Sequence, residues 1–294
     1  MTHYHFFTTD VFTTTPFAGN PLAVFPDARG LTTAQMSAIA REFNLSETVF
    51  VLPPRDPRHT RSVRIFTPAR ELPFAGHPTI GTAMVLADAG YVTAVEDGDV
   101  EIVLEEGIGP IHVVVRMQDN APVSAQLSVH AMPEIGPPPP DRAKVAAMLS
   151  LTPTDIVAGA HAIQTVSCGV PYLFVPVVDN AVVGRARPVG TLDGHNVFVF
   201  AQLGERVHAR MFAPEFGIVE DPATGSAVAA LGGYLSEREA SRADGTRRWV
   251  VDQGVEMGRP SRLELEVDRT GGHITAVRVG GSSVVISEGS ILLV

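Results

Sequence analysis

Asp221-Pro222-Ala223-Thr224-Gly225-Ser226-Ala227 is a turn of small residues that leads into an apolar stretch, and an earlier part of the chain resembles it. The earlier turn is Phe74-Ala75-Gly76-His77-Pro78. An Arg-x-Phe-x-Pro motif precedes each turn, and its two copies begin at Arg64 and Arg210, 146 positions apart (210 minus 64). Each copy predicts a strand, a small-residue turn and a helix.

Two further repeats keep nearly the same offset. Gly19-Asn20-Pro21 returns as Gly169-Val170-Pro171 after 150 positions, and Val49-Phe50-Val51 returns as Val197-Phe198-Val199 after 148. Three repeats at nearly one offset indicate an internal duplication. Because small ligands usually bind in clefts between domains, the duplication predicts a working site between two lobes.

The predicted fold class is α+β, with two pseudo-symmetric lobes, each a curved, barrel-like mixed β-sheet around a central helix. The helices expected over residues 78–90 and 227–235 have almost no polar side chains, which indicates burial on most sides. Another helix is expected from Thr32 to near Asn44. We place the N-terminal lobe at residues 1–118, with residues 283–294 returning to it, and the C-terminal lobe at residues 119–282.

The bulk composition limits the classes of function. The chain has 294 residues, of which 45% are hydrophobic and 18% charged, as in compact globular proteins. A formal net charge of −10 disfavours a nucleic-acid partner, since there is no basic surplus to neutralise phosphates. The single cysteine, Cys168, cannot form an intramolecular disulfide. With no signal peptide and no apolar run of membrane-spanning length, we expect a cytoplasmic protein with no membrane partner.

The two turns are candidate anion-binding sites. Backbone N–H groups at a helix N-terminus carry partial positive charge and bind carboxylate or phosphate. Gly76 in the first turn, and Gly225 and Ser226 in the second, are therefore candidate substrate-binding residues for a small carboxylate-bearing substrate. The alternative is that both glycines serve only the tight packing of core helices.

Three ionisable residues flank the turns: Glu47, His77 and Asp221. The duplication matches Glu47 with His195, so the two halves do not carry equivalent acids. One carboxylate in such a cleft suits a proton taken from one carbon and returned to another. The structural alternatives are that Glu47 caps a loop, that Asp221 caps the following helix, and that His77 is a core histidine.

Motifs for cofactors are absent. The sequence has neither the Gly-x-Gly-x-x-Gly fingerprint after a strand nor a phosphate-binding loop ending in Gly-Lys-Ser/Thr. His3 and His5 could share one face of a strand, but no third metal ligand is evident. We expect no cofactor and no metal.

Five motifs along the chain form an ordered set: Pro16-Phe17-Ala18-Gly19-Asn20-Pro21-Leu22-Ala23-Val24, Ser46-Glu47-Thr48, Glu71-Leu72-Pro73-Phe74-Ala75-Gly76-His77-Pro78-Thr79, Gly169-Val170-Pro171-Tyr172 and Glu220-Asp221-Pro222-Ala223-Thr224-Gly225-Ser226-Ala227. In this order and spacing the chain resembles the PhzF-like phenazine biosynthesis family over nearly its whole length. The resemblance implies a diaminopimelate-epimerase-like fold, an active site in the cleft, no cofactor and a homodimer.

The resemblance also implies a reaction. In the characterised branch of the family, trans-2,3-dihydro-3-hydroxyanthranilate is isomerised: a glutamate moves a proton from C3 of the ring to C1, and the enol becomes a ketone. The position of that glutamate corresponds to Glu47, the substrate-contacting histidine and aspartate to His77 and Asp221, and the carboxylate-binding turns to Gly76, Gly225 and Ser226.

Related racemases and epimerases of this fold use two cysteines, one at the head of each helix. Here those places hold Ala75 and the Pro222-Ala223 pair, which excludes a two-thiol mechanism. The leading hypothesis is a cofactor-independent isomerase acting on a small cyclic or unsaturated amino or carboxylic acid. The alternatives are an epimerase that uses Glu47 with a second, non-cysteine acid, and a non-catalytic protein that binds small carboxylates.

Overall fold

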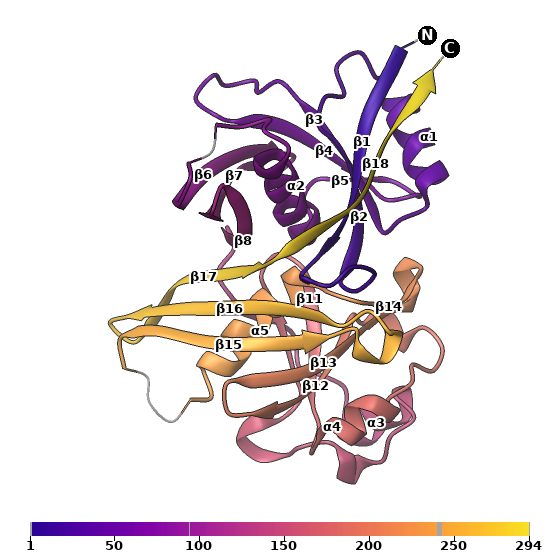
Figure 1. The fold of residues 1–294 in the computed structure, drawn as a ribbon. Coiled ribbons are helices and arrows are strands. Elements are labelled where there is room, and N and C mark those ends of the chain that lie inside the picture. The colour runs from indigo at the N-terminus through magenta and orange to yellow at the C-terminus, as the bar shows by residue number, and fades with distance from the viewer. Residues whose placement is uncertain (1, 94, 240–242, 294) are drawn as a thin grey trace. The chain divides into compact units, whose positions relative to one another are not determined.

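The computed structural model describes residues 2–93, 95–239 and 243–293 (Figure 1). The chain groups into two compact units: unit 1 comprises Met1–Ser128 and Gly280–Val294, and unit 2 comprises Val129–Val279. The boundary predicted from the sequence lies at residue 118, ten residues earlier. The difference arises because β8 (Ala121–Ser128) forms an antiparallel pair with β7 (Gly109–Gln118) and so stays with unit 1.

Unit 1 contains a mixed sheet. Its other strands are β1 (Thr2–Val11), β2 (Asn20–Phe25), β3 (Glu47–Leu52), β4 (Arg61–Phe66), β5 (Glu71–Leu72), β6 (Gly98–Glu106) and β18 (Ser283–Leu293). Strand β1 pairs antiparallel with both β18 and β2, so the two ends of the chain lie side by side (Figure 1). The pairs β2–β3 and β4–β6 are parallel, whereas β3–β4 and β6–β7 are antiparallel.

Two helices belong to unit 1. The expected helix near residue 32 is confirmed as α1 (Thr33–Phe43): Thr32 and Gln35 form a capping box, and Asn44 ends the helix in the left-handed conformation. Helix α2 (Gly76–Asp88) is buried continuously from His77 to Ala87. Gly81 permits this packing, because a Cβ there would lie 2.6 Å from Val11 Cγ2 and 2.7 Å from Leu22 Cδ2.

Unit 2 contains a second mixed sheet. Its strands are β9 (Glu134–Ile135), β10 (Gln164–Ser167), β11 (Pro171–Pro176), β12 (Val197–Leu203), β13 (Arg206–Ala213), β14 (Ile218–Asp221), β15 (Gly245–Gln253), β16 (Ser261–Thr270) and β17 (His273–Gly281). The pairs β11–β12 and β13–β15 are parallel, whereas β10–β11, β12–β13 and β15–β16 are antiparallel. This succession of pairings is the same as that of β1, β2, β3, β4, β6 and β7 in unit 1.

The long helix of unit 2 is α5 (Gly225–Ser236), which is buried from Ala227 to Ser236. Helix α3 (Arg142–Met148) begins where Asp141 caps it. Helix α4 (Asn180–Arg185) was not expected, because six residues are too few to show a helical period. Single-turn 3-10 helices complete the unit: Pro153–Asp155, Gly159–His161, Leu192–Gly194, Pro214–Phe216 and Val255–Met257.

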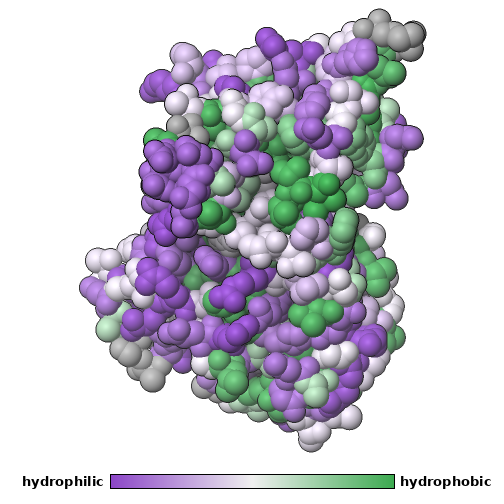
Figure 2. Space-filling view, viewed as in Figure 1, coloured by the Kyte–Doolittle hydropathy of each residue, from purple (hydrophilic) through white to green (hydrophobic). Residues whose placement is uncertain are grey.

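Hydrophobic residues on the face shown in Figure 2 form patches interrupted by hydrophilic ones. Exposed apolar side chains such as Phe17 and Leu203 are scattered along the chain. Within the described ranges, no helix is both long and apolar enough to cross a membrane.

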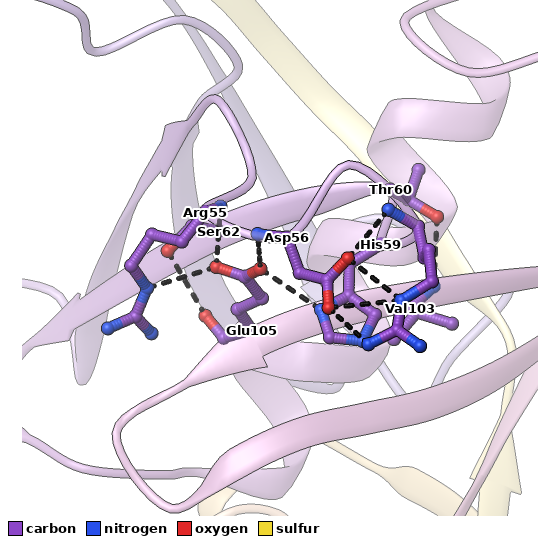
Figure 3. A network of polar contacts seen from close by, with 8 residues as sticks. Arg55, Asp56, His59, Thr60, Ser62, Val103 and Glu105 are labelled. Atoms are coloured by element: carbon purple, nitrogen blue, oxygen red, sulfur yellow. Dashed lines mark hydrogen bonds and ion pairs between the residues drawn. The ribbon is translucent and has the colours of Figure 1, made fainter.

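A buried carboxylate, Glu105, ties the loop before β4 to the end of β6 (Figure 3). Its Oε1 accepts from the Asp56 backbone N–H at 2.7 Å, and its Oε2 accepts from the backbone N–H of Arg55 at 2.9 Å and from Arg55 Nε at 3.0 Å. His59 Nδ1 lies 3.0 Å from Oε1. Burial alone would raise the pKa of Glu105, but these hydrogen bonds lower it to about 2.

Replacing Glu105 with Ala is expected to reduce the free energy of unfolding by on the order of 3 kcal/mol, because it removes several hydrogen bonds that a buried, charged carboxylate accepts from partly buried donors. Urea unfolding at neutral pH measures the loss. Glu101→Ala, at an exposed position on the same strand, is the control and should cost less than about 1 kcal/mol. Equal losses in the two variants would contradict the role given to Glu105.

Candidate active-site residues of the two units

The candidate residues of unit 1 lie at the start of α2. Ala75 is the N-cap in an extended conformation (φ −154°, ψ 131°), and its side chain makes no capping hydrogen bond. Gly76 and His77 are the first two helical residues, and Pro78 has no N–H to satisfy. The turn therefore presents the backbone amides of Gly76 and His77, together with the positive end of the helix dipole, for an anion.

Glu47 is the first residue of β3 and pairs in register with Leu22 of β2. Its Oε2 lies 3.2 Å from His77 Nε2, and the two side chains are only 12% and 8% exposed. The structure thus brings together two of the three ionisable residues singled out in the sequence. Both are screened from water, which strengthens their electrostatic effect on any bound group.

The imidazole of His77 is neutral at physiological pH. Burial lowers its pKa to about 3. The contact with Glu47 is therefore a close polar contact between a carboxyl group and a neutral ring, rather than an ion pair. A neutral imidazole can orient the carboxyl group without holding its charge in a salt bridge.

Acid should destabilise the protein partly through His77. In the unfolded chain a histidine binds a proton when the pH falls below its ordinary pKa of 6.5. Folded His77 stays neutral until the pH falls to about 3. The unfolded state binds more protons in this window, so the free energy of unfolding falls as the pH falls from 6.5 towards 3. Between neutral pH and about pH 5, the parent should lose on the order of 2 kcal/mol more than His77→Gln.

Urea unfolding at the two pH values measures this difference. His112→Gln, which changes a histidine that is more than half exposed, is the control and should keep the parent's pH dependence. If His77→Gln also keeps the parent's pH dependence, burial of the neutral His77 ring is not the cause of the loss of stability in acid.

The candidate residues of unit 2 lie at the start of α5. Asp221 ends β14, and its Oδ2 accepts a hydrogen bond from Thr224 Oγ1 at 2.5 Å. Thr224 is the N-cap, but its side chain does not bond to the helix amides, which leaves the turn at Gly225 and Ser226 open for an anion. Gly225 and Ser226 are the first two helical residues, as Gly76 and His77 are in α2.

Tyr172 ends one of the five motifs and is a further candidate residue that is not among the six predicted from the sequence. It is buried, and its hydroxyl lies 2.7 Å from Ser226 Oγ. Burial raises the pKa of Tyr172 to about 12, so the phenol keeps its proton and can orient the serine hydroxyl. Its position directly after the repeated Gly-Val-Pro segment is the sequence signal that could have identified it.

The structure therefore groups Glu47, Gly76 and His77 in unit 1, and Asp221, Gly225 and Ser226 in unit 2. Cys168 is half-buried, and burial raises the pKa of its thiol to about 12, which does not suit a nucleophile. In the part of the chain that the structure describes, no cluster of three or more His, Cys, Asp or Glu residues could hold a metal ion.

Known proteins resemble the chain over its whole length. The family model for phenazine biosynthesis-like proteins matches residues 9–289. An uncharacterized isomerase of Mesorhizobium japonicum is 41% identical, with 97% of each chain covered. The trans-2,3-dihydro-3-hydroxyanthranilate isomerase of Pseudomonas aeruginosa is 35% identical, with 97% of this chain and 98% of the relative covered.

A solved structure shows the fold. The PhzF-family phenazine biosynthesis protein of Bacillus anthracis superposes with a TM-score of 0.89 at 24% identity, with 100% of both chains covered. The two proteins share a mixed fold of helices and extensive mixed β-sheet.

Proposed function

The chain belongs to the family of phenazine biosynthesis-like proteins, and we propose that it is a cofactor-independent isomerase that moves a proton on a small cyclic or unsaturated amino or carboxylic acid. Relatives that match almost the whole chain are named isomerases. The observation that carries the proposal is the contact between Glu47 and His77, a carboxyl group and a neutral imidazole 3.2 Å apart beside the amides that begin α2.

Each residue has a role in the proposed reaction. The amides at Gly76 and at Gly225 and Ser226 bind the substrate carboxylate and other anionic oxygens. Glu47 takes a proton from one carbon, the double bond shifts, and the same carboxyl group returns the proton to another carbon. His77 orients Glu47, and Asp221 holds a polar group of the substrate. With trans-2,3-dihydro-3-hydroxyanthranilate the proton would pass from C3 to C1, and the resulting enol would become the ketone.

The proposal also covers the similarity of the two lobes, the location of the protein and its oligomeric state. The equal succession of strand pairings in the two units supports two pseudo-symmetric lobes of the diaminopimelate-epimerase type, each with its long buried helix at the centre. We also propose that the protein is cytoplasmic and works as a homodimer. Sedimentation of the purified protein tests the dimer, since a monomer at all concentrations would contradict it.

The test of function is incubation with trans-2,3-dihydro-3-hydroxyanthranilate, followed by NMR of the products and by thermal unfolding. The expected result is the isomerised product. If the compound is not converted but raises the melting temperature, the protein binds the anion and its substrate is another small carboxylic acid. Exchange at one stereocentre without a double-bond shift would indicate an epimerase. Neither conversion nor stabilisation, with this compound or related acids, would overturn the proposal.

A further inference from the structure

The ends of β6 and β15 have similar sequences, and each lies next to one of the two helix-starting turns. Strand β6 ends in Leu104-Glu105-Glu106 before Gly107, and β15 ends in Val251-Asp252-Gln253 before Gly254. Glu106 and Gln253 are 147 positions apart (253 minus 106), which lies within the range of 146 to 150 set by the three repeats. Each strand runs parallel to a strand of its own unit, β6 to β4 and β15 to β13.

In unit 2, Gln253 holds the turn that precedes α5. Its side chain is fully buried. Its Nε2 donates to the carbonyl of Asp221 at 2.8 Å and to Thr224 Oγ1 at 3.1 Å, and its Oε1 accepts from the Thr224 backbone N–H at 3.3 Å. One amide thus supplies both donor and acceptor to the turn, and this fixes where Gly225 and Ser226 begin the helix.

In unit 1, Glu106 reaches the turn that precedes α2. It is 2% exposed, and its Oε1 lies 2.6 Å from Thr79 Oγ1. The same hydroxyl lies 2.7 Å from the carbonyl of Ala75. A hydroxyl has one proton, so Thr79 donates either to Glu106, as it would to the ionised carboxylate, or to the Ala75 carbonyl; in the second case a protonated Glu106 can donate to Thr79 Oγ1. The backbone N–H of Ala75 donates toward the same carboxyl group, which completes a ring of polar contacts around Ala75.

The glycine that follows Glu106 and the glycine that follows Gln253 each pack against a proline two residues before the N-cap of the helix. A Cβ at Gly107 would lie 2.8 Å from Pro73 Cα and 2.9 Å from the Pro73 carbonyl oxygen. A Cβ at Gly254 would lie 2.6 Å from the Pro222 carbonyl oxygen and 3.0 Å from Pro222 Cα. The two strand ends therefore meet the two turns in the same way.

We propose that Glu106 and Gln253 are equivalent positioning residues, each holding the turn at which a substrate-binding helix begins, with Glu106 serving in its neutral form where unit 2 uses an amide. The inference rests on the proposed function in one respect, that the start of α2 binds the carboxylate of the substrate. Glu106 touches no substrate in this scheme. It acts through the positions of Gly76 and His77.

The surroundings of Glu106 keep it neutral. Burial raises its pKa to about 8, against the opposing effect of the hydrogen bonds from Thr79 and Ala75. The charged groups of the neighbouring elements occur mainly in pairs: Arg64 of β4 lies 2.7 Å from Glu71 of β5, and the loop residue Arg55 lies 3.0 Å from Glu105 of β6. Other titratable groups of the neighbouring elements include His77, which is neutral, Glu47 beside it, and His59, which contacts Glu105. Arg61 of β4 donates to the Tyr91 carbonyl, and Asp88 lies at the far end of α2.

A pH dependence of substrate binding follows. When Glu106 ionises, a negative charge appears under the helix N-terminus and competes with the substrate carboxylate for the same positive potential. The KM of the parent should rise by about tenfold between about pH 7 and about pH 9.5, because the two like charges repel each other. The kcat should change much less, since Glu106 is not part of the chemical step.

The test compares the parent with Glu106→Gln and with the reciprocal change Gln253→Glu. Glu106→Gln should keep the parent's KM at about pH 7 and abolish its rise at high pH. Gln253→Glu should acquire a new rise in KM with pH. Glu106→Ala should raise KM at every pH, because the turn loses its partner. A purely structural role would shift KM in all variants without changing its pH profile.

A second measurement does not depend on turnover. The pKa of Glu106 is raised from 4.5 to about 8 in the folded protein. The contribution of this shift to the free energy of unfolding is therefore fully present below pH 4.5 and is lost as the pH rises through about 8. The urea midpoint of the parent should therefore fall more than that of Glu106→Gln between about pH 5 and about pH 9.

The two readouts separate the possible failures. If the midpoints differ as expected but no small carboxylic acid is bound or converted at any pH, the role of Glu106 stands and the proposed function fails. If Glu106→Gln matches the parent in both pH profiles, the inference about Glu106 is overturned, whatever the function.

Discussion

Replacing Glu47 with Gln is expected to lower kcat for the isomerisation by roughly 10²–10⁴-fold, which is the range that a positioned general acid–base group contributes. The amide has nearly the size of the carboxyl group and can still lie against His77 Nε2. It cannot take a proton from carbon at neutral pH. KM should change little, because the amides at the start of α2, which are proposed to bind the substrate carboxylate, are untouched.

Steady-state kinetics with the substrate identified by NMR measure this effect. Glu42→Gln, at an exposed position on α1, is the matched control and should retain the parent's kcat. Thermal unfolding with and without substrate shows whether the Glu47 variant still folds and binds. If Glu47→Gln folds, binds and turns over at the parent's rate, Glu47 is not the proton shuttle.

Replacing Gly254 with Ala is expected to distort the turn that begins α5. A Cβ there would lie 2.5 Å from the carbonyl oxygen of Arg259 and 2.6 Å from that of Pro222, at a backbone φ of +73°. The clash should cost on the order of 3 kcal/mol or more in the free energy of unfolding. Pro222 must shift, and the turn that presents Gly225 and Ser226 shifts with it, so kcat/KM should fall by up to roughly 10²-fold.

Gly258 provides a close control for Gly254. Its φ is +72°, but a Cβ there would meet no atom within 4 Å. Gly258→Ala should therefore cost only the backbone strain of the left-handed conformation, about 1 kcal/mol, and leave kcat/KM near the parent value. Urea unfolding and kinetics of the two variants separate clash from strain. Equal losses of stability and activity would show that the contact with Pro222 is not what matters.

The sequence was sufficient to predict the family, and the family model confirms that prediction over residues 9–289. Local signals also predicted α1, since the Thr32 cap and the stop at Asn44 depend on neighbouring residues only. The six candidate site residues came from two turns and one strand start. Their assignment to a substrate stays a prediction.

Other features depend on contacts between segments that are distant in the sequence. The distance of 3.2 Å between Glu47 and His77 depends on how β3 packs against α2, and no spacing rule gives it. Glu106 follows another glutamate at the end of a strand, where the sequence suggests solvent exposure, yet it is buried. The pKa values of the two adjacent carboxyl groups are shifted in opposite directions. Several hydrogen bonds lower the pKa of Glu105, whereas burial raises the pKa of Glu106.

The extent of unit 1 and the contact of Tyr172 with Ser226 also depend on the tertiary structure. Strand β8 joins unit 1 through its pairing with β7, although the polar residues before it suggested a boundary there. The hydroxyl of Tyr172 reaches Ser226 across 54 positions of sequence, at 2.7 Å. Only the repeated segment before Tyr172 marked this region as part of the duplicated pattern.

Transfer of a deuterium label is the decisive measurement for the proton shuttle. Trans-2,3-dihydro-3-hydroxyanthranilate carrying deuterium at C3 is incubated in ordinary water with the parent and with Glu47→Gln, and the product is examined by NMR. If Glu47 takes the label and returns it, the parent gives isomerised product with part of the deuterium at C1, and the variant gives no measurable product in the same time. Product formed by Glu47→Gln at the parent's rate, with the same labelling, would contradict the assignment.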